Sequence, residues 1–324
     1  MRGACAWRDP LTRSPAAVIV AGLGGNVTDT IMGVKTLVLT VISMFAFAAN
    51  SVLCRLALAG ERIDPAAFTL LRLASGAVIL LAIVALRGRS GAGVALEAPA
   101  ADRGPRAWIG GLYLFAYAAA FSFAYVELDA GAGALILFGT VQLTMILAGL
   151  RSGERPPPRE WVGFAAAAVG LVALIAPGAT APAPGGAVLM TFAGLAWGLY
   201  SLRGRGAGDP VLHTRTNFLR ALPPSLVLVA ALFARLQVSM EGLLLAVASG
   251  ALASGLGYVV WYAALPGLTA TRAATVQLSV PVLAAIGGIL LLDESLTPRF
   301  AVSAVLVLGG IGLAVTTRSA PTRE

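Results

Sequence analysis

Two stretches of this chain, residues 154–172 and 294–312, share a pattern that constrains the fold more than any other feature of the sequence. Each runs from the end of one apolar segment into the next, and they match at four positions: Glu154/Glu294, Pro158/Pro298, Arg159/Arg299 and Gly170/Gly310. An odd number of membrane-length apolar segments lies between them, so equivalent residues face opposite sides of a bilayer. The duplication therefore predicts two halves that are inserted in opposite directions.

The composition indicates a membrane protein. Hydrophobic residues make up 58% of the chain and charged residues 12%, and the mean hydropathy is +0.86. These values lie far outside the balance of a soluble domain. A helix needs about 20 apolar residues to cross the hydrocarbon core, and several segments lack the alternation typical of a β-barrel. We therefore predict an all-α integral membrane protein with ten transmembrane helices, near residues 36–58, 65–86, 108–126, 130–150, 160–177, 186–203, 213–233, 242–264, 270–292 and 299–316.

Lys and Arg residues indicate the orientation, because loops rich in them stay in the cytoplasm. With the N-terminus inside, most of the 23 basic residues fall on inner segments, and the outer loops carry only Arg62, Arg235 and Arg299. We therefore expect an inner-membrane protein with both termini in the cytoplasm. This topology and contact with the lipid bilayer explain the net charge of +8. The basic residues are too dispersed to indicate nucleic acid binding.

The sequence offers little material for catalysis. It has two cysteines, Cys5 and Cys54, and one histidine, His213, so it indicates no disulfide framework, zinc site or histidine-based catalytic group. It also lacks a Gly-rich phosphate-binding loop followed by Lys. All 15 acidic residues fall outside the predicted span centres, so an intramembrane carboxylate relay for protons is not supported. We expect no enzyme activity, no cofactor and no metal.

Several ordered features resemble the EamA family of the drug/metabolite transporter superfamily. The resemblance covers about residues 33–317 and includes the stretches MGVKTLVLTVISMFAFAANSVLCRLAL, ALILFGTVQLTMILAGLRSGE and ATVQLSVPVLAAIGGILLLDESLTPRF. It rests on an Arg in the second and seventh spans, AWG at residues 196–198, Pro281, and a Glu after the fourth and ninth spans. It implies two inverted five-helix repeats around a central cavity, with alternating access. The halves differ where Val141 corresponds to Pro281 and Phe47 to Trp197.

This resemblance divides the chain into a first repeat at residues 34–178, a second repeat at residues 184–317 and a cytoplasmic tail at residues 318–324. Residues 1–33 precede the family-like part, and their apolar run is too short to cross a membrane. We expect either an unstructured extension or an upstream start assigned in error, with Met32 as the real beginning.

Arg72 and Arg220 lie within predicted spans, where a charged side chain costs about 2.5 to 3.5 kcal/mol at the bilayer centre. Both must therefore face polar groups. Either they hold a substrate carboxylate or a gate, or they pair with carbonyl groups and helix ends and so hold the repeats together. Arg55 lies near the outer end of the first span, and we expect its side chain to extend toward the membrane interface.

Uncharged polar and aromatic residues are further candidates for a cavity wall. Buried amides such as that of Asn50 need a partner helix or a ligand. Pro281 is expected to free the carbonyl group of Gln277, four residues earlier. Tyr258, Trp261 and Tyr262 share one helical face, directed either to lipid or to an apolar substrate. The predicted substrate-binding residues are Asn50, Arg72, Gln142, Trp197, Tyr200, Arg220, Tyr258 and Gln277.

These features predict a secondary transporter, and the resemblance implies export of small organic metabolites such as amino acids. One alternative is an exchanger of anionic metabolites that uses Arg72 and Arg220. Another, from a different class, is a non-transporting membrane sensor or an enzyme, which should present clustered Asp, His or Cys residues at one interface. The expected partners are a small-molecule substrate and the lipid bilayer. The sequence leaves the oligomeric state open.

Overall fold

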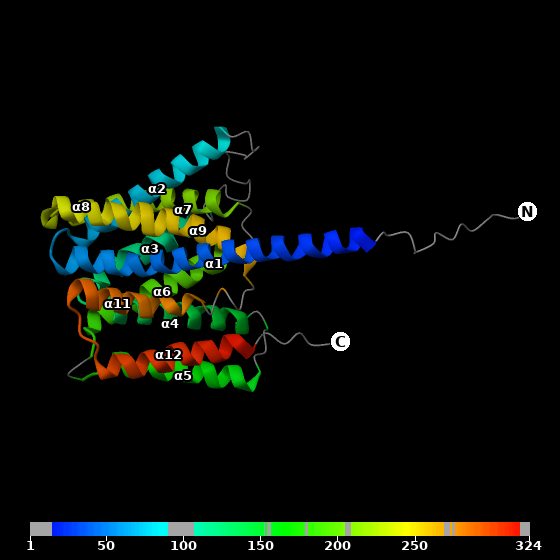
Figure 1. The fold of residues 1–324 in the computed structure, drawn as a ribbon. Helices are drawn as coiled ribbons and strands as arrows, with labels where there is room; N and C mark the ends of the chain where they lie inside the picture. Colours follow the sequence, from blue (N-terminus) through cyan, green and yellow to red (C-terminus); the bar gives the residue numbers. More distant parts are fainter. Residues whose placement is uncertain are drawn as a thin grey trace, which may run out of the picture.

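Long helices lie side by side in a single bundle (Figure 1). The computed structural model describes residues 15–89, 107–151, 153, 157–178, 181–204, 209–268, 273 and 276–317. The helices are α1 (Pro15–Ala59), α2 (Pro65–Arg89), α3 (Trp108–Ala124), α4 (Ala130–Arg151), α5 (Pro158–Ile175), α6 (Pro184–Gly204), α7 (Pro210–Ala231), α8 (Met240–Val247), α9 (Gly257–Ala264), α11 (Ser279–Leu292) and α12 (Pro298–Thr317). A π-helical segment, Ala248–Leu256, joins α8 to α9. Counted with that segment as one rod, these residues form ten long helices and no extended strand, which confirms the predicted all-α class.

Length and hydropathy agree with a membrane location for most of these helices. Six are long and apolar enough to span a bilayer, and three shorter apolar helices cover residues 108–124, 279–292 and 298–314. Helix α7 belongs to neither group. It carries Arg215, Asn217 and Arg220 among its apolar residues. The polar groups of α7 therefore need partners inside the bundle.

The structure departs from the predicted boundaries at two places. Helix α1 begins at Pro15 and so includes residues 15–33, for which the sequence predicted an unstructured extension; residues 1–14 and the tail 318–324 lie outside the described residues. The ninth span was predicted from residue 270, whereas α11 begins at Ser279. Helical residues 276 and 277 and a turn at residue 278 come directly before α11, so Pro281 lies in the first turn after this interruption. That Pro281 frees the carbonyl group of Gln277 stays a prediction.

Local sequence explains where several helices begin. Proline stands at the first position of α2, α5, α6, α7 and α12, where its fixed φ angle suits a helix and its missing N–H costs nothing. Two of these prolines follow an aspartate cap. Asp64 Oδ1 accepts hydrogen bonds from the N–H groups of Ala66 and Ala67, and Asp209 Oδ1 accepts one from Val211. Such caps keep the connections short.

The bundle has two ends with different connections. The start of α1 and the end of α12 lie at one end, which we call the terminal end (Figure 1). The opposite end, which we call the turn end, holds the described connecting residues 60–64, 125–129, 176–178, 181–183, 232–239 and 293–297. The first half of the chain, α1 to α5, starts at the terminal end, and the second half, α6 to α12, starts at the turn end.

The last helices of the two halves pack against each other as an antiparallel pair. Helices α5 and α12, the last of each half, meet where the backbones of Gly163 and Gly310 approach so closely that a Cβ on either would touch the other's carbonyl oxygen. Further along, Gly170 packs on Leu306 and Val307. The numbering rises along one helix and falls along the other, so the two helices run in opposite directions. Small residues permit this close contact between membrane helices.

Candidate substrate cavity

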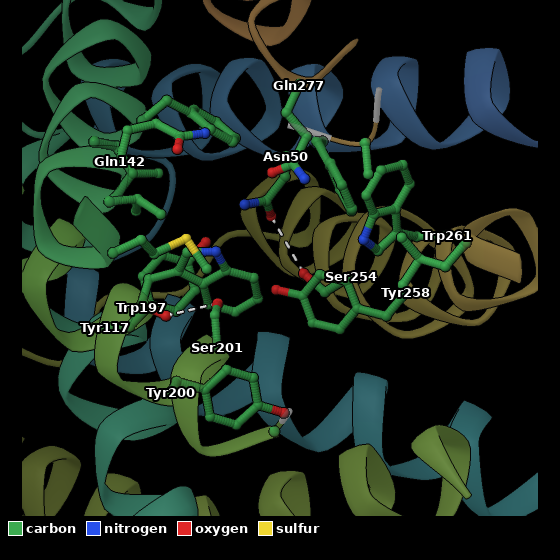
Figure 2. A pocket seen from close by; sticks show the side chains of 18 of the residues that line it. Asn50, Tyr117, Gln142, Trp197, Tyr200, Ser201, Ser254, Tyr258, Trp261 and Gln277 are labelled. Carbon is green, nitrogen blue, oxygen red and sulfur yellow. Dashed lines mark hydrogen bonds between the residues drawn. The ribbon is translucent and has the colours of Figure 1, made fainter. Parts of the chain in front are cut away.

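A cavity of about 570 Å³ lies between the two halves of the bundle. Its volume lies in the range of small-molecule sites. Helices α1, α3, α4 and α5 contribute residues from the first half, and α6, α7, the π segment, α9 and α12 contribute residues from the second half. Six of the eight predicted substrate-binding residues line it: Asn50, Gln142, Trp197, Tyr200, Tyr258 and Gln277. Figure 2 shows Asn50, Gln142, Trp197 and Tyr258 around one open space.

The cavity reaches only one end of the bundle. Gly204 and Pro210, at the connection between α6 and α7, and Leu265, just after α9, belong to its lining at the terminal end. None of the described connections at the turn end lines it. Toward that end the lining stops at residues such as Ser51 and Ser254. The arrangement is a pocket open toward the terminal end and closed toward the turn end.

Aromatic rings form much of the wall. The Trp197 ring centre lies 4.8 Å from that of Tyr117 and 5.3 Å from that of Tyr258. Phe47 makes edge contacts with Tyr258 and Trp261, each at 5.9 Å between ring centres. Offset and edge contacts of this kind fix ring positions. The predicted face of Tyr258, Trp261 and Tyr262 is therefore directed to the cavity and not to lipid.

Hydrogen bonds orient the side chain of Asn50 on α1. Its Oδ1 accepts from the hydroxyl of Ser249 at 2.7 Å and from that of Ser254 at 3.4 Å, both on the rod that contains the π segment. Figure 2 shows the bond to Ser254 as a dashed line. Asn50 therefore makes the helix contact that the sequence offered as one alternative, and it also lines the cavity. Contact with a ligand stays a prediction.

Arg72 on α2 does not line the cavity but lies directly behind its wall. Its side chain is only 2% exposed. Nη2 donates to the Tyr117 hydroxyl at 3.0 Å and Nε donates to the Ser254 hydroxyl at 3.4 Å. The guanidinium carbon lies 5.1 Å from the ring centre of Tyr117 and 4.8 Å from that of Phe121. Three cavity-lining residues thus hold this cation at short range.

Arg220 on α7 lies elsewhere. It is half-buried, and Nη1 donates to the carbonyl oxygen of Ala107, just before α3, at 2.7 Å. Gly111 on α3 leaves room for the Arg220 backbone and Cβ. This contact with a helix end matches the structural alternative that the sequence left open, and it does not bring Arg220 to the cavity.

Sequence reasoning missed Tyr117 and Phe121, which line the cavity from α3. Tyr113, Tyr117, Phe121 and Tyr125 are spaced by four residues, and this spacing places aromatic side chains on one face of a helix. That periodicity is the signal that was present in the sequence and not used.

Polar contacts between the halves close the turn end. Arg55 donates to the carbonyl oxygens of Tyr125 and Val126 at 3.1 and 2.9 Å, and its Nε lies 3.4 Å from Glu294. The Arg55 side chain thus extends to the connections at residues 125–129 and 293–297 of the turn end, the direction that the sequence predicted. Glu294 also accepts from the Ala130 N–H at 2.9 Å. Burial raises the pKa of the Glu294 carboxyl group above its ordinary value.

Additional contacts join the same end. Arg62 pairs with Glu241 at 2.8 Å, and the N–H of Ser239 donates to the Arg62 carbonyl oxygen at 2.8 Å. Glu127 accepts from the N–H of Gly186 at 2.9 Å. Glu154, the predicted equivalent of Glu294 in the first half, lies outside the described residues.

A ten-helix apolar bundle with one central cavity defines the class of multi-pass membrane proteins, and comparison with known proteins supplies the family. The EamA-like transporter family matches residues 34–176 and again residues 184–316. An uncharacterized protein of Pseudomonas aeruginosa is 55% identical over 284 residues, which cover 88% of this chain and 96% of that protein. The chain belongs to the EamA-like transporter family, within the drug/metabolite transporter superfamily.

A solved crystal structure supports the fold. It superposes with a TM-score of 0.60 and covers 87% of this chain and 99% of the other, at 18% sequence identity. At this identity the likeness concerns the fold alone. The family membership confirms the resemblance seen in the sequence and makes this protein a membrane transporter.

Proposed function

We propose that the protein is a secondary transporter that exports small organic metabolites such as amino acids by alternating access around the central cavity. The observation that carries this proposal is a cavity built by both halves of the bundle, open toward one end and closed by contacts between the halves at the other. Alternating access needs such a site between two bodies that move against each other. The antiparallel pairing of α5 with α12 supports two inverted five-helix repeats.

The charge distribution supports an orientation in the inner membrane. Lys35, Arg87, Arg151 and Arg203 lie toward the terminal end, and basic residues favour the cytoplasmic side. In this orientation both termini are cytoplasmic and the cavity opens toward the cytoplasm. Reporter fusions at the N-terminus and the C-terminus should both be active only in the cytoplasm, and a periplasmic signal from either would overturn the orientation.

Transport by the purified full chain in proteoliposomes tests the function. Vesicles loaded with a panel of labelled amino acids and organic acids should release at least one of them faster than protein-free vesicles. Ala253→Trp places a large side chain in the cavity and should abolish this flux, whereas Leu290→Trp, on an exposed surface of α11, should retain it. Absence of flux for the whole panel, or equal flux from both variants, would overturn the proposal.

The alternative function is the exchange of anionic metabolites, with Arg72 and Arg220 as the residues that bind the anion. Only one of these two arginines lies near the cavity. Arg220 binds a backbone carbonyl at the start of α3, so it is not available as a cavity anchor. Arg72, behind the cavity wall, still places a positive charge near a bound substrate. Flux measured with and without substrate on the opposite side separates the modes, because an exchanger needs substrate on both sides of the vesicle and a uniporter does not.

A further inference from the structure

We propose that the part of the cavity nearest the turn end binds the carboxylate group of the substrate, with Asn50 and Tyr117 as hydrogen-bond donors and Arg72 as the charge behind them. This inference rests on the proposed transport function, because it assigns the substrate class of the same cavity. The remaining wall then receives an apolar or aromatic part of the same molecule.

The first donor is the amide of Asn50. Its carbonyl oxygen accepts hydrogen bonds from Ser249 and Ser254. An amide whose oxygen is occupied in this way presents its NH₂ group, which carries two donors and no acceptor. Because Asn50 belongs to the cavity lining, those donors serve a ligand that carries acceptor oxygens.

The second donor is the hydroxyl of Tyr117. Its oxygen accepts a hydrogen bond from Arg72 Nη2 at 3.0 Å, which leaves the hydroxyl hydrogen free to donate. A bond from a charged donor polarises the hydroxyl and strengthens the bond that it donates in turn. Tyr117 lines the cavity, so the positive charge of Arg72 acts on a ligand through it.

The charge of Arg72 lacks an acidic counterpart among the described residues. No ion pair of the described residues includes Arg72, and its buried Nη1 has no hydrogen-bond partner there. The faces of Tyr117 and Phe121 compensate part of the charge. No Asp or Glu belongs to the described cavity lining. A buried cation is costly without a counter-ion, and a ligand carboxylate in this corner supplies one.

The rest of the lining defines the other part of the ligand. Trp197, Tyr258 and Trp261 present aromatic surface, and Gln142 and Gln277 present neutral amides. The class that fits is a small organic carboxylate with an apolar or aromatic tail, including amino acids of that kind. The neutral amides of Gln142 and Gln277 can lie beside the α-ammonium group of an amino acid, but they do not need a positive charge there. Carboxylates with and without an ammonium group therefore both fit.

Matched pairs of probes test the carboxylate directly. Binding of 3-phenylpropanoate and 3-phenylpropanamide, and of L-phenylalanine and L-phenylalaninamide, is measured by calorimetry on the full chain in lipid nanodiscs. A hydrogen bond to a charged group contributes about 1.5 to 3 kcal/mol, so each carboxylate should bind about tenfold to a hundredfold more tightly than its amide. Equal affinities within both pairs, or no saturable binding of any probe, would overturn the proposal.

Tyr117→Phe removes the hydroxyl donor and keeps the ring. It should weaken carboxylate binding about tenfold and leave amide binding unchanged. The matched control is Tyr113→Phe, one turn earlier on α3 and outside the cavity lining, which should leave both affinities unchanged. Equal weakening of carboxylate and amide by Tyr117→Phe would contradict the role assigned to the hydroxyl.

The outcomes separate this proposal from the transport proposal. Carboxylate preference without flux in proteoliposomes would leave the site standing and overturn transport. Flux without carboxylate preference would leave transport standing and overturn the site. Should Tyr117→Phe fail to give a folded protein, the comparison of probes on the unmodified chain decides alone.

Discussion

The two ends of this bundle differ in how the halves of the chain meet. At the turn end, Arg55 reaches Glu294 and Arg62 reaches Glu241, and backbone groups of facing turns bond to one another. At the terminal end, the cavity separates the halves. An ion pair between Arg87 and Asp209, at 3.8 Å, joins the halves at this end, and Arg220 holds the start of α3. The two halves share a sequence pattern and run in opposite directions, yet the bundle that they form is closed at one end and open at the other.

Under the proposed alternating access, this difference identifies which contacts must change during transport. In that cycle the turn end opens as the terminal end closes, so the contacts of Arg55 and Arg62 have to be reversible. The partly exposed Arg62–Glu241 pair contributes little free energy, which suits a switch between states of similar stability. The glycine contact between α5 and α12 involves no such polar bond, and we expect it to persist through the cycle.

The largest expected effect comes from forcing α2 away from the rod formed by α8, the π segment and α9. In Gly250→Val the new Cβ would fall on the carbonyl oxygen of Arg72, so α2 and the π segment would have to separate. Overpacking of this kind costs about 1 to 3 kcal/mol or more. We expect a clear fall in thermal stability and in the yield of monodisperse protein. Gly309→Val is the control, since no atom lies near its Cβ; equal behaviour of the two variants would contradict the packing described.

Opening the turn end should have the next largest effect. Arg55→Ala removes the bonds to Glu294 and to two carbonyl oxygens, so the closed end loses stability relative to an open one. A cysteine at Leu137 in the cavity, with Cys5 and Cys54 replaced by serine, reports access by a membrane-impermeant thiol reagent from the turn-end side. We expect labelling at least about tenfold faster in Arg55→Ala, equal to about 1.4 kcal/mol. Unchanged labelling would show that Arg55 does not keep this end closed.

The pH dependence of stability tests the role of the Glu294 carboxyl group at the turn end. Burial raises its pKa in the closed state. Its protonated form is therefore favoured on folding, and this contribution to stability is complete below the ordinary carboxyl pKa and lost as pH rises through the raised value. The midpoint of thermal unfolding should fall over that pH window in the unmodified protein and show less pH dependence in Glu294→Gln. Identical pH profiles would rule out this carboxyl group as the cause.

The smallest effect is expected at the terminal end. Arg87→Gln removes the ion pair with Asp209, whose side chains are 41% and 33% exposed. Exposed pairs contribute about 0 to 1 kcal/mol, so thiol labelling from the turn end and thermal stability should both change little. An effect as large as that of Arg55→Ala would remove the distinction between the two ends.

The sequence predicted the helices well because their existence depends on hydropathy and length, which are local properties. It predicted less about the direction of individual side chains. Asn50 and Gln142 were assigned to a cavity on polarity alone, and they line it. Arg72 and Arg220 looked equivalent in the sequence, yet one lies behind the cavity and the other at the start of α3. In helices that are apolar on all sides, the periodicity does not define which face is inside.

Contacts between distant residues could not be derived from the sequence. Arg55 meets Glu294 because α1 packs beside α11, and no local pattern encodes that pairing. Tyr117 was overlooked because it appeared as one of many aromatic residues on an apolar helix.

The π segment determines which chemical group of Asn50 faces the cavity. Ser249 and Ser254 are five residues apart, and in an α-helix they would point about 140° away from each other. The wider winding brings both hydroxyls to one oxygen atom, so the amide nitrogen is the group that remains. Deleting one residue between them would shift the angular phase of α9 by about 100°, turning Tyr258 and Trp261 off the wall while the span keeps nearly its full length.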